Sequence, residues 1–216
     1  MSRIFPRHSN LQKYLLLTNG LSAFLWLAVL MRLLVLFPLV GTRFLPGGIA
    51  DFFLAMQFLI VIELANYFVI FRKPNVRTRT PSLVNLALGT FTRAIVSYGT
   101  IWKYPRVARN NAFALLIASE SISETIRYAY VVYKVRTFGL VSTPIRYLKS
   151  FSTMIMFPVR VLCEMALLFV ALPYADHDNP TFASFLRILL LLYVPTLYVV
   201  YSSTFRSGRS SHQKES

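Results

Sequence analysis

The chain has 216 residues, of which 56% are hydrophobic and 15% aromatic, and its formal net charge is +15. Charged residues make up only 14% of it, whereas soluble domains carry roughly 25%. The composition therefore argues against an ordinary soluble protein. The single cysteine, Cys163, excludes an internal disulfide framework.

The apolar residues form long blocks, and a helix needs roughly 20 such residues to cross a bilayer core of about 30 Å. Breaks rich in Gly, Pro or charge separate the blocks, at residues 41–48, 73–81, 103–111, 135–144 and 173–180. The pattern predicts an all-α integral membrane protein with a bundle of six transmembrane helices, at residues 14–40, 50–71, 82–102, 111–133, 150–172 and 181–203. Three regions follow from it: an N-terminal cytoplasmic segment (1–13), a membrane domain (14–203) and a polar cytoplasmic tail (204–216).

The basic residues are divided unequally between the two ends of the predicted helices. One side holds Arg3, Arg7, Lys13, Arg72, Lys73, Arg77, Arg79, Lys134, Arg136, Arg146, Lys149, Arg206, Arg209 and Lys214. The other side holds Arg43, Lys103, Arg106 and Arg109. Since basic residues are retained in the cytoplasm, both termini are expected there. This bias explains the net charge without a nucleic-acid partner, although attraction to anionic lipid or to a nucleotide-bearing substrate stays open.

Several ionisable residues lie inside the predicted spans, where a charge costs at least about 2.5–3.5 kcal/mol on insertion scales. Glu120, Glu124 and Arg127 have the spacing i, i+4, i+7, which places them on one helical face, with Tyr128 and Tyr130 near its edges. The other spans contribute Arg32, Glu63, Arg93, Arg160, Glu164 and Arg187. These residues either line a polar chamber or hold the bundle together as ion pairs, and the residues alone leave both alternatives open.

The fifth predicted span carries a second charged face. Phe157, Arg160 and Glu164 share one side of this helix, next to Pro158. A carboxylate in an apolar chamber suits general acid or base catalysis. An ion pair with Arg160 four residues earlier would instead stabilise the charged form, and this alternative is equally open.

These motifs resemble a known family. The sequence S-I-x-E-x-x-R-Y-x-Y at residues 121–130, followed by a span with P-x-x-x-x-x-E from Pro158, is similar to the very-long-chain (3R)-3-hydroxyacyl-CoA dehydratases, once called protein tyrosine phosphatase-like proteins. Weaker matches are N-x-L-S-A-x-x-W from Asn19, I-E-x-x-N from Ile62, and Thr92-Arg93. A phosphatase loop is not supported, because Phe169 stands where such a loop needs Arg six residues after Cys163.

The resemblance implies a six-helix, multi-pass protein of the endoplasmic reticulum membrane. It implies a lyase that removes water from long-chain 3-hydroxyacyl-CoA to give trans-2-enoyl-CoA in fatty-acid elongation, with other elongation enzymes as partners. No cofactor and no metal ion are expected. The catalytic residue carried over is Glu164. The substrate-binding or chamber-lining candidates are Glu63, Arg93, Glu124, Arg127, Tyr128, Tyr130 and Arg160.

Two positions depart from the family pattern. The family has a catalytic Tyr directly before the proline and a Gly two residues after it, and this chain has Phe157 and Arg160 there. One alternative is a dehydratase with a rearranged site, in which Glu164 transfers the protons while Arg160 polarises the thioester carbonyl, or in which Tyr128 or Tyr130 supplies the missing hydroxyl. The other is a catalytically impaired relative that binds acyl chains or serves as a scaffold in the elongation complex.

The charge distribution gives a direct test of topology. With 14 basic residues on one side and 4 on the other, acceptor tags for N-glycosylation fused to either terminus are expected to stay unmodified in cells. Mobility shifts with and without a glycosidase measure this. A glycosylated tag at either terminus would contradict the six-span arrangement.

Overall fold

A computed structural model describes residues 9–59, residue 63 and residues 83–195, and the described part is helical, with no strand in it. The predicted tail (204–216) and parts of the N-terminal segment and of the second, third and sixth spans lie outside these residues. The helices are α1 (Asn10–Met56), α3 (Leu83–Ala94), the π-helix η1 (Ile95–Trp102), the 3-10 turn η2 (Val107–Arg109), α4 (Asn111–Arg136), α5 (Thr143–Asp178) and a last helix, Pro180–Pro195.

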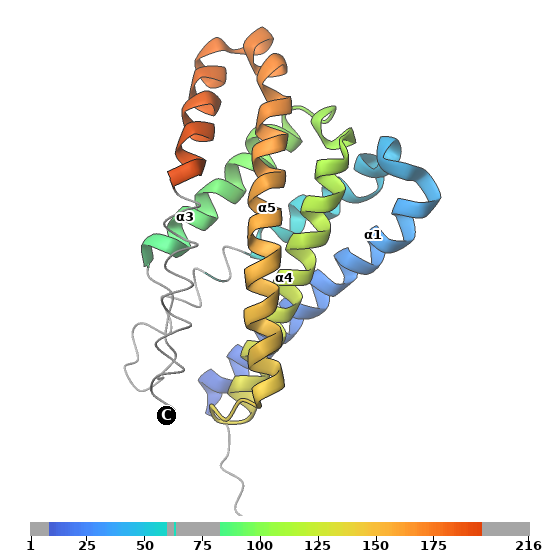
Figure 1. Cartoon of the computed structure of the whole chain (residues 1–216). Helices are drawn as coiled ribbons and strands as arrows, with labels where there is room; N and C mark the ends of the chain where they lie inside the picture. The colour runs from blue at the N-terminus through green and yellow to red at the C-terminus, as the bar shows by residue number, and fades with distance from the viewer. Residues whose placement is uncertain (1–8, 60–62, 64–82, 196–216) are drawn as a thin grey trace, which may run out of the picture.

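Helix α4 is the centre of the assembly, because α1 packs against it on one side and α5 on the other. The start of α1 and the connection between α4 and α5 lie at one end of the molecule (Figure 1). The bend in α1, the η2 turn and the end of α5 lie towards the other end (Figure 1). This order agrees with helices that cross from end to end, while the count of six and the side each end faces stay predictions.

Helix α1 consists of two limbs that meet at Gly41, whose φ of 64° and ψ of 179° are not helical. Only glycine adopts this combination readily. Pro38 precedes it and cannot donate the hydrogen bond that would continue the helix. A connection over residues 41–48 was expected from the sequence, but in the structure a single non-helical residue, Gly41, joins the two limbs. The second limb therefore starts well before residue 50.

An aromatic chain holds the two limbs of α1 to α4. Trp26 of the first limb meets Phe53 of the second with ring centroids 6.2 Å apart, and Phe53 meets Phe113 of α4 at 6.0 Å. Both contacts are edge-to-face, a geometry worth about 0.5–1.5 kcal/mol beyond the buried area. All three rings are fully buried, so this chain fixes the angle between the limbs.

Large apolar side chains also cover the outside of α1. Its buried residues follow helical spacing along one face, from Leu15 through Trp26 to Leu33, whereas Leu17, Phe24 and other apolar residues point outward. The most apolar window of α1 has a mean hydropathy of 2.4 with 17% of its residues buried, and that of α5 has 2.1 with 33% buried. Both helices are long and apolar enough to cross a membrane, and a soluble core helix would be mostly buried.

Asparagine side chains begin two of the later helices. The Asn110 Oδ1 accepts a hydrogen bond from the Ala112 amide at 3.0 Å, which caps α4. The Asn179 Oδ1 accepts from the amides of Thr181 and Phe182 at 3.1 and 3.2 Å, with Pro180 at the first helical position. A break over 173–180 was expected, yet α5 continues through Pro173 to Asp178, and one residue separates it from the next helix.

The end of η1 is tied to the end of α5 by polar contacts. The Lys103 Nζ lies 2.8 Å from the Asp178 Oδ2, and the Tyr104 hydroxyl donates to the same oxygen at 3.1 Å. The hydrogen bond to Asp178 raises the pKa of Lys103 above its ordinary value. These contacts are exposed and orient the helix ends.

The bend in α1 predicts opposite effects for two glycine substitutions. Gly41→Ala forces a side chain into the left-handed φ of 64° and should lower the free energy of unfolding by about 1–3 kcal/mol. Gly20→Ala is the matched control within the same helix, because a methyl group there meets no atom within 4 Å. It should be neutral or stabilising by up to about 1 kcal/mol. Thermal unfolding in detergent compares them; equal effects would contradict the assigned bend.

Candidate functional site

A buried ion-pair network occupies the face of α4 that looks towards α3. Arg93 of α3 is held between two carboxylates: its Nε lies 3.2 Å from the Glu120 Oε1, and its Nη2 donates to the Glu124 Oε1. Glu120 and Glu124 are both buried, and the Arg93 side chain is only 13% exposed. Because an unpaired charge at such a position is very costly, α3 and α4 are locked together here.

Arg127 extends this network to Glu63, which follows α1 in the sequence. Its Nε donates to the Glu124 Oε2 at 2.7 Å, and its Nη2 donates to the Glu63 Oε2 at 2.9 Å. The Tyr128 hydroxyl is 3.5 Å from the same Glu63 oxygen, and its ring lies under the Arg127 guanidinium. Glu124 is therefore shared by two guanidinium groups and is the centre of the network.

The network is not fully satisfied at its inner end. The Gln57 Nε2 donates to the Glu120 Oε2 at 3.4 Å, a long hydrogen bond. Among the described residues, the Gln57 Oε1 and the hydroxyls of Ser121 and Thr125 are buried without a hydrogen-bond partner, and the Glu120 Oε1 has only its ion pair with Arg93. The Gln57 oxygen and the two hydroxyls could therefore bind a polar group.

A second cluster surrounds Glu164 on α5. Its Oε2 accepts a hydrogen bond from the Tyr193 hydroxyl at 2.8 Å, and its Oε1 lies 3.3 Å from the Arg160 Nε without hydrogen-bond geometry. The Arg160 guanidinium lies 5.4 Å from the centre of the Phe157 ring. Phe157 offers this cluster an apolar face and no hydroxyl.

The structure brings together most of the residues singled out from the sequence. Glu63, Arg93, Glu124, Arg127 and Tyr128 lie in the first cluster, and Phe157, Arg160 and Glu164 in the second. Tyr130 lies apart, with its ring 4.1 Å from the Lys149 Nζ.

Sequence reasoning missed Tyr193, the residue whose hydroxyl reaches Glu164. The expected sources of that hydroxyl were Tyr128 and Tyr130, and both make other contacts. Tyr193 occupies a run of apolar residues in the last helix, where no charge or motif marks it. A tyrosine at membrane depth, which needs a partner for its hydroxyl, was the one available signal.

The chemistry open to these clusters is that of carboxylates and a hydroxyl. Glu164 and Tyr193 form a hydrogen-bonded carboxylate–hydroxyl pair, an arrangement that acid–base catalysis uses, and the Arg160 guanidinium lies beside them. Within the described ranges, no three His, Cys, Asp or Glu side chains are grouped so as to hold a metal ion.

Comparisons with known proteins place this geometry in context. The family model described as protein tyrosine phosphatase-like protein, PTPLA, matches residues 57–214. The β-1,6-glucan synthesis-associated protein KEG1 of Saccharomyces cerevisiae is 28% identical over 204 residues, which covers 93% of this chain and 97% of that protein. No solved structure matches the chain.

Two dehydratases of rice, Oryza sativa subsp. japonica, match over a shorter region. The very-long-chain (3R)-3-hydroxyacyl-CoA dehydratases PASTICCINO 2B and PASTICCINO 2A are 30% and 29% identical over 83 residues. This region covers 38% of the chain and 37% of each dehydratase. Similarity along nearly the whole length is thus to the glucan-associated protein.

The shared carboxylate predicts a large loss of stability on neutralisation. Glu124→Gln leaves Arg93 and Arg127 buried with one partner fewer each and should cost about 3–5 kcal/mol. Asp176→Asn is the control, since Asp176 pairs with Arg187 in the exposed part of the structure, and its loss should cost about 1 kcal/mol or less. Unfolding temperatures in detergent measure both. Similar losses from the two variants would show that the network contributes little.

Proposed function

Because the chain belongs to the protein tyrosine phosphatase-like (PTPLA) family, we propose that it is a non-catalytic, multi-pass member of that family that serves β-1,6-glucan synthesis. The relative similar along almost its entire length is named for that process. The dehydratases correspond to little more than a third of the chain. The proposed location is the endoplasmic reticulum membrane, as the resemblance to elongation dehydratases implies.

The observation that carries this proposal is the state of the Phe157 position. The resemblance requires a tyrosine hydroxyl there, and the Phe157 ring instead packs against the Arg160 guanidinium. Removing a positioned acid or base typically lowers a rate by about 10²–10⁴. The second departure is Arg160, which stands where the family has Gly and places its Nε 3.3 Å from the Glu164 Oε1. Both departures favour a retained fold without the dehydratase reaction.

A second candidate function is supported by Tyr193. Its hydroxyl lies 2.8 Å from Glu164, so a hydroxyl–carboxylate pair exists although its hydroxyl comes from another helix. In this candidate, Glu164 moves the proton, Tyr193 supplies the hydroxyl, and Arg160 polarises the thioester carbonyl of a long-chain 3-hydroxyacyl-CoA. The product is the trans-2-enoyl-CoA, and other elongation enzymes are the partners.

Tyr193→Phe separates the two candidates, because it removes one oxygen and keeps the ring. Expressed in Saccharomyces cerevisiae depleted of its glucan-associated relative, the wild-type chain and this variant should restore β-1,6-glucan to the same level. The purified wild-type protein should form no enoyl-CoA from a long 3-hydroxyacyl-CoA. Wild-type turnover that falls about 10²-fold or more in Tyr193→Phe would establish the dehydratase instead.

The matched control adds the missing oxygen at the family position. Phe157→Tyr, alone and with Arg160→Gly, rebuilds the family pattern around Glu164. The two changes are neighbours and need not act additively. Activity that appears only in the rebuilt double variant would support a site that lost its chemistry through these two positions. Equal activity in wild type and double variant would contradict that account.

A further inference from the structure

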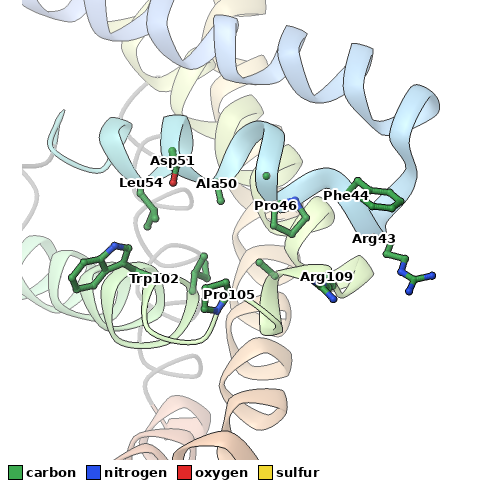
Figure 2. Close-up of a pocket in the computed structure, with 12 residues that line it drawn as sticks. Arg43, Phe44, Pro46, Ala50, Asp51, Leu54, Trp102, Pro105 and Arg109 are labelled. Atoms are coloured by element: carbon green, nitrogen blue, oxygen red, sulfur yellow. The ribbon is translucent and has the colours of Figure 1, made fainter.

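A cavity of about 380 Å³ lies between the second limb of α1 and the connection from η1 to η2, apart from both charge clusters. Figure 2 shows Pro46, Ala50 and Leu54 of α1 on one side of it, and Trp102 and Pro105 on the other. No residue of the proposed acid–base pair lines it. The function proposed above leaves this cavity unexplained.

Two sharp changes of chain direction build the cavity. The bend at Gly41 brings Arg43 and Phe44 to the start of the second limb, at one edge of the cavity (Figure 2). Pro105 and the 3-10 turn that ends at Arg109 bring a second guanidinium to the lining from the other side. Two arginines distant in sequence therefore border the same hollow.

The charged groups that line the cavity are unpaired. Arg43, Asp51 and Arg109 have no ion pair or side-chain hydrogen bond among the described residues. Two other pairs of charged side chains at this end of the molecule do contact each other, Lys103–Asp178 and Arg187–Asp176. The cavity thus presents free guanidinium donors and one free carboxylate.

The location makes the arginines unexpected. They are two of only four basic residues in the predicted connections on the side where the positive-inside bias predicts few. Retaining a positive charge on that side opposes the predicted topology. A ligand with negative charge would explain why two of the four meet at one cavity.

The rest of the lining is apolar, with an exposed aromatic edge and a buried inner wall. Phe44 and Trp102 are each 69% exposed, and Leu54, Ile101 and Ala108 form the inner wall. Aromatic side chains at the ends of membrane helices lie at the level of lipid headgroups. A ligand here would meet both an aqueous, charged edge and a lipid-facing, aromatic edge.

We propose that this cavity binds the phosphodiester headgroup of an anionic membrane phospholipid. Guanidinium groups recognise phosphate through paired, charge-assisted hydrogen bonds, and basic pockets between membrane helices bind lipid headgroups. Arg43 and Arg109 hold the phosphate, and Trp102 with Phe44 contacts the adjoining apolar part. Asp51 accepts a hydrogen bond from a headgroup hydroxyl. The site is independent of the role in glucan synthesis.

Trp102 provides the readout. The full-length protein is placed in phosphatidylcholine vesicles that contain an increasing share of phosphatidylglycerol brominated near the top of its acyl chains. Bromine quenches tryptophan fluorescence on contact. The other tryptophan, Trp26, is 1% exposed, and Trp102→Phe measures its background. The expected result is quenching that saturates at a low share of phosphatidylglycerol.

Three variants test the site. Arg43→Gln with Arg109→Gln should raise the half-saturating lipid share at least about tenfold, because two charge-assisted donors are lost. Arg106→Gln removes a charge from the same connection without touching the cavity lining and should leave it unchanged. Gly47→Leu keeps both arginines and adds a bulky side chain to the cavity lining, at a position where a Cβ meets no atom within 4 Å; it should also abolish saturation. Helical content by circular dichroism verifies folding.

The results that overturn the proposal are distinct. An unchanged titration in the double arginine variant, or an equal shift in Arg106→Gln, would show that only general surface charge matters. Saturable quenching in Gly47→Leu would place the lipid outside the cavity. Quenching that never saturates with phosphatidylglycerol, together with a saturable change in Trp102 fluorescence on adding inorganic phosphate alone, would identify a site for free phosphate instead of a lipid.

Discussion

The pairing of Glu124 with two arginines is the interaction on which the rest of the structure depends. Helix α4 is buried between α1 and α5, and its inner face carries charges that neither lipid nor an apolar core would accept alone. Each must therefore find an opposite charge on a neighbouring segment. Arg93 on α3 pairs with Glu124, and Glu63, which follows α1 in the sequence, pairs with Arg127. The charges of α4 therefore help to determine where Arg93 and Glu63 lie.

The buried carboxylate of α5 also has partners, but they differ in kind from those of Glu124. Glu164 is paired, but within its own helix by Arg160 and by a hydroxyl from the last helix. The first cluster joins segments through several strong ion pairs, whereas this one holds a single carboxylate between a guanidinium and a phenol. Such a carboxylate can transfer a proton in an active site, or it can serve only to hold two helices together. In the function proposed above, the residue at position 157 decides between these roles.

The sequence was sufficient for the features that depend on local pattern. Apolar blocks with few charges identify a helical membrane protein, and the spacing of Glu120, Glu124 and Arg127 groups them on one face. The pattern could not name the arginine that meets them, because contacts between helices depend on packing that no single segment encodes. The role of Tyr193 was not predicted for the same reason, because its hydrogen-bond partner, Glu164, lies 29 residues away in the sequence and on another helix.

Helix limits were also harder to predict than helix identity. The residues 41–48 and 173–180 both contain proline and suggest extended connections. In the structure a single glycine and a single asparagine suffice, because glycine accepts a left-handed φ and asparagine caps a helix that starts with proline. Composition signals that a chain turns, while the turn's length depends on the dihedral angles and hydrogen bonds of one residue.

These one-residue connections have a consequence for how the protein can be handled by a cell or an experimenter. At this end of the molecule, Gly41 and Asn179 each join two helices without an extended loop. A protease therefore has little extended chain to bind, and an inserted epitope would disturb a helix. The segment of residues 103–110 is longer, but its η2 turn packs against α1 and α4. A soluble antibody or modifying enzyme would find few extended segments among the described residues there.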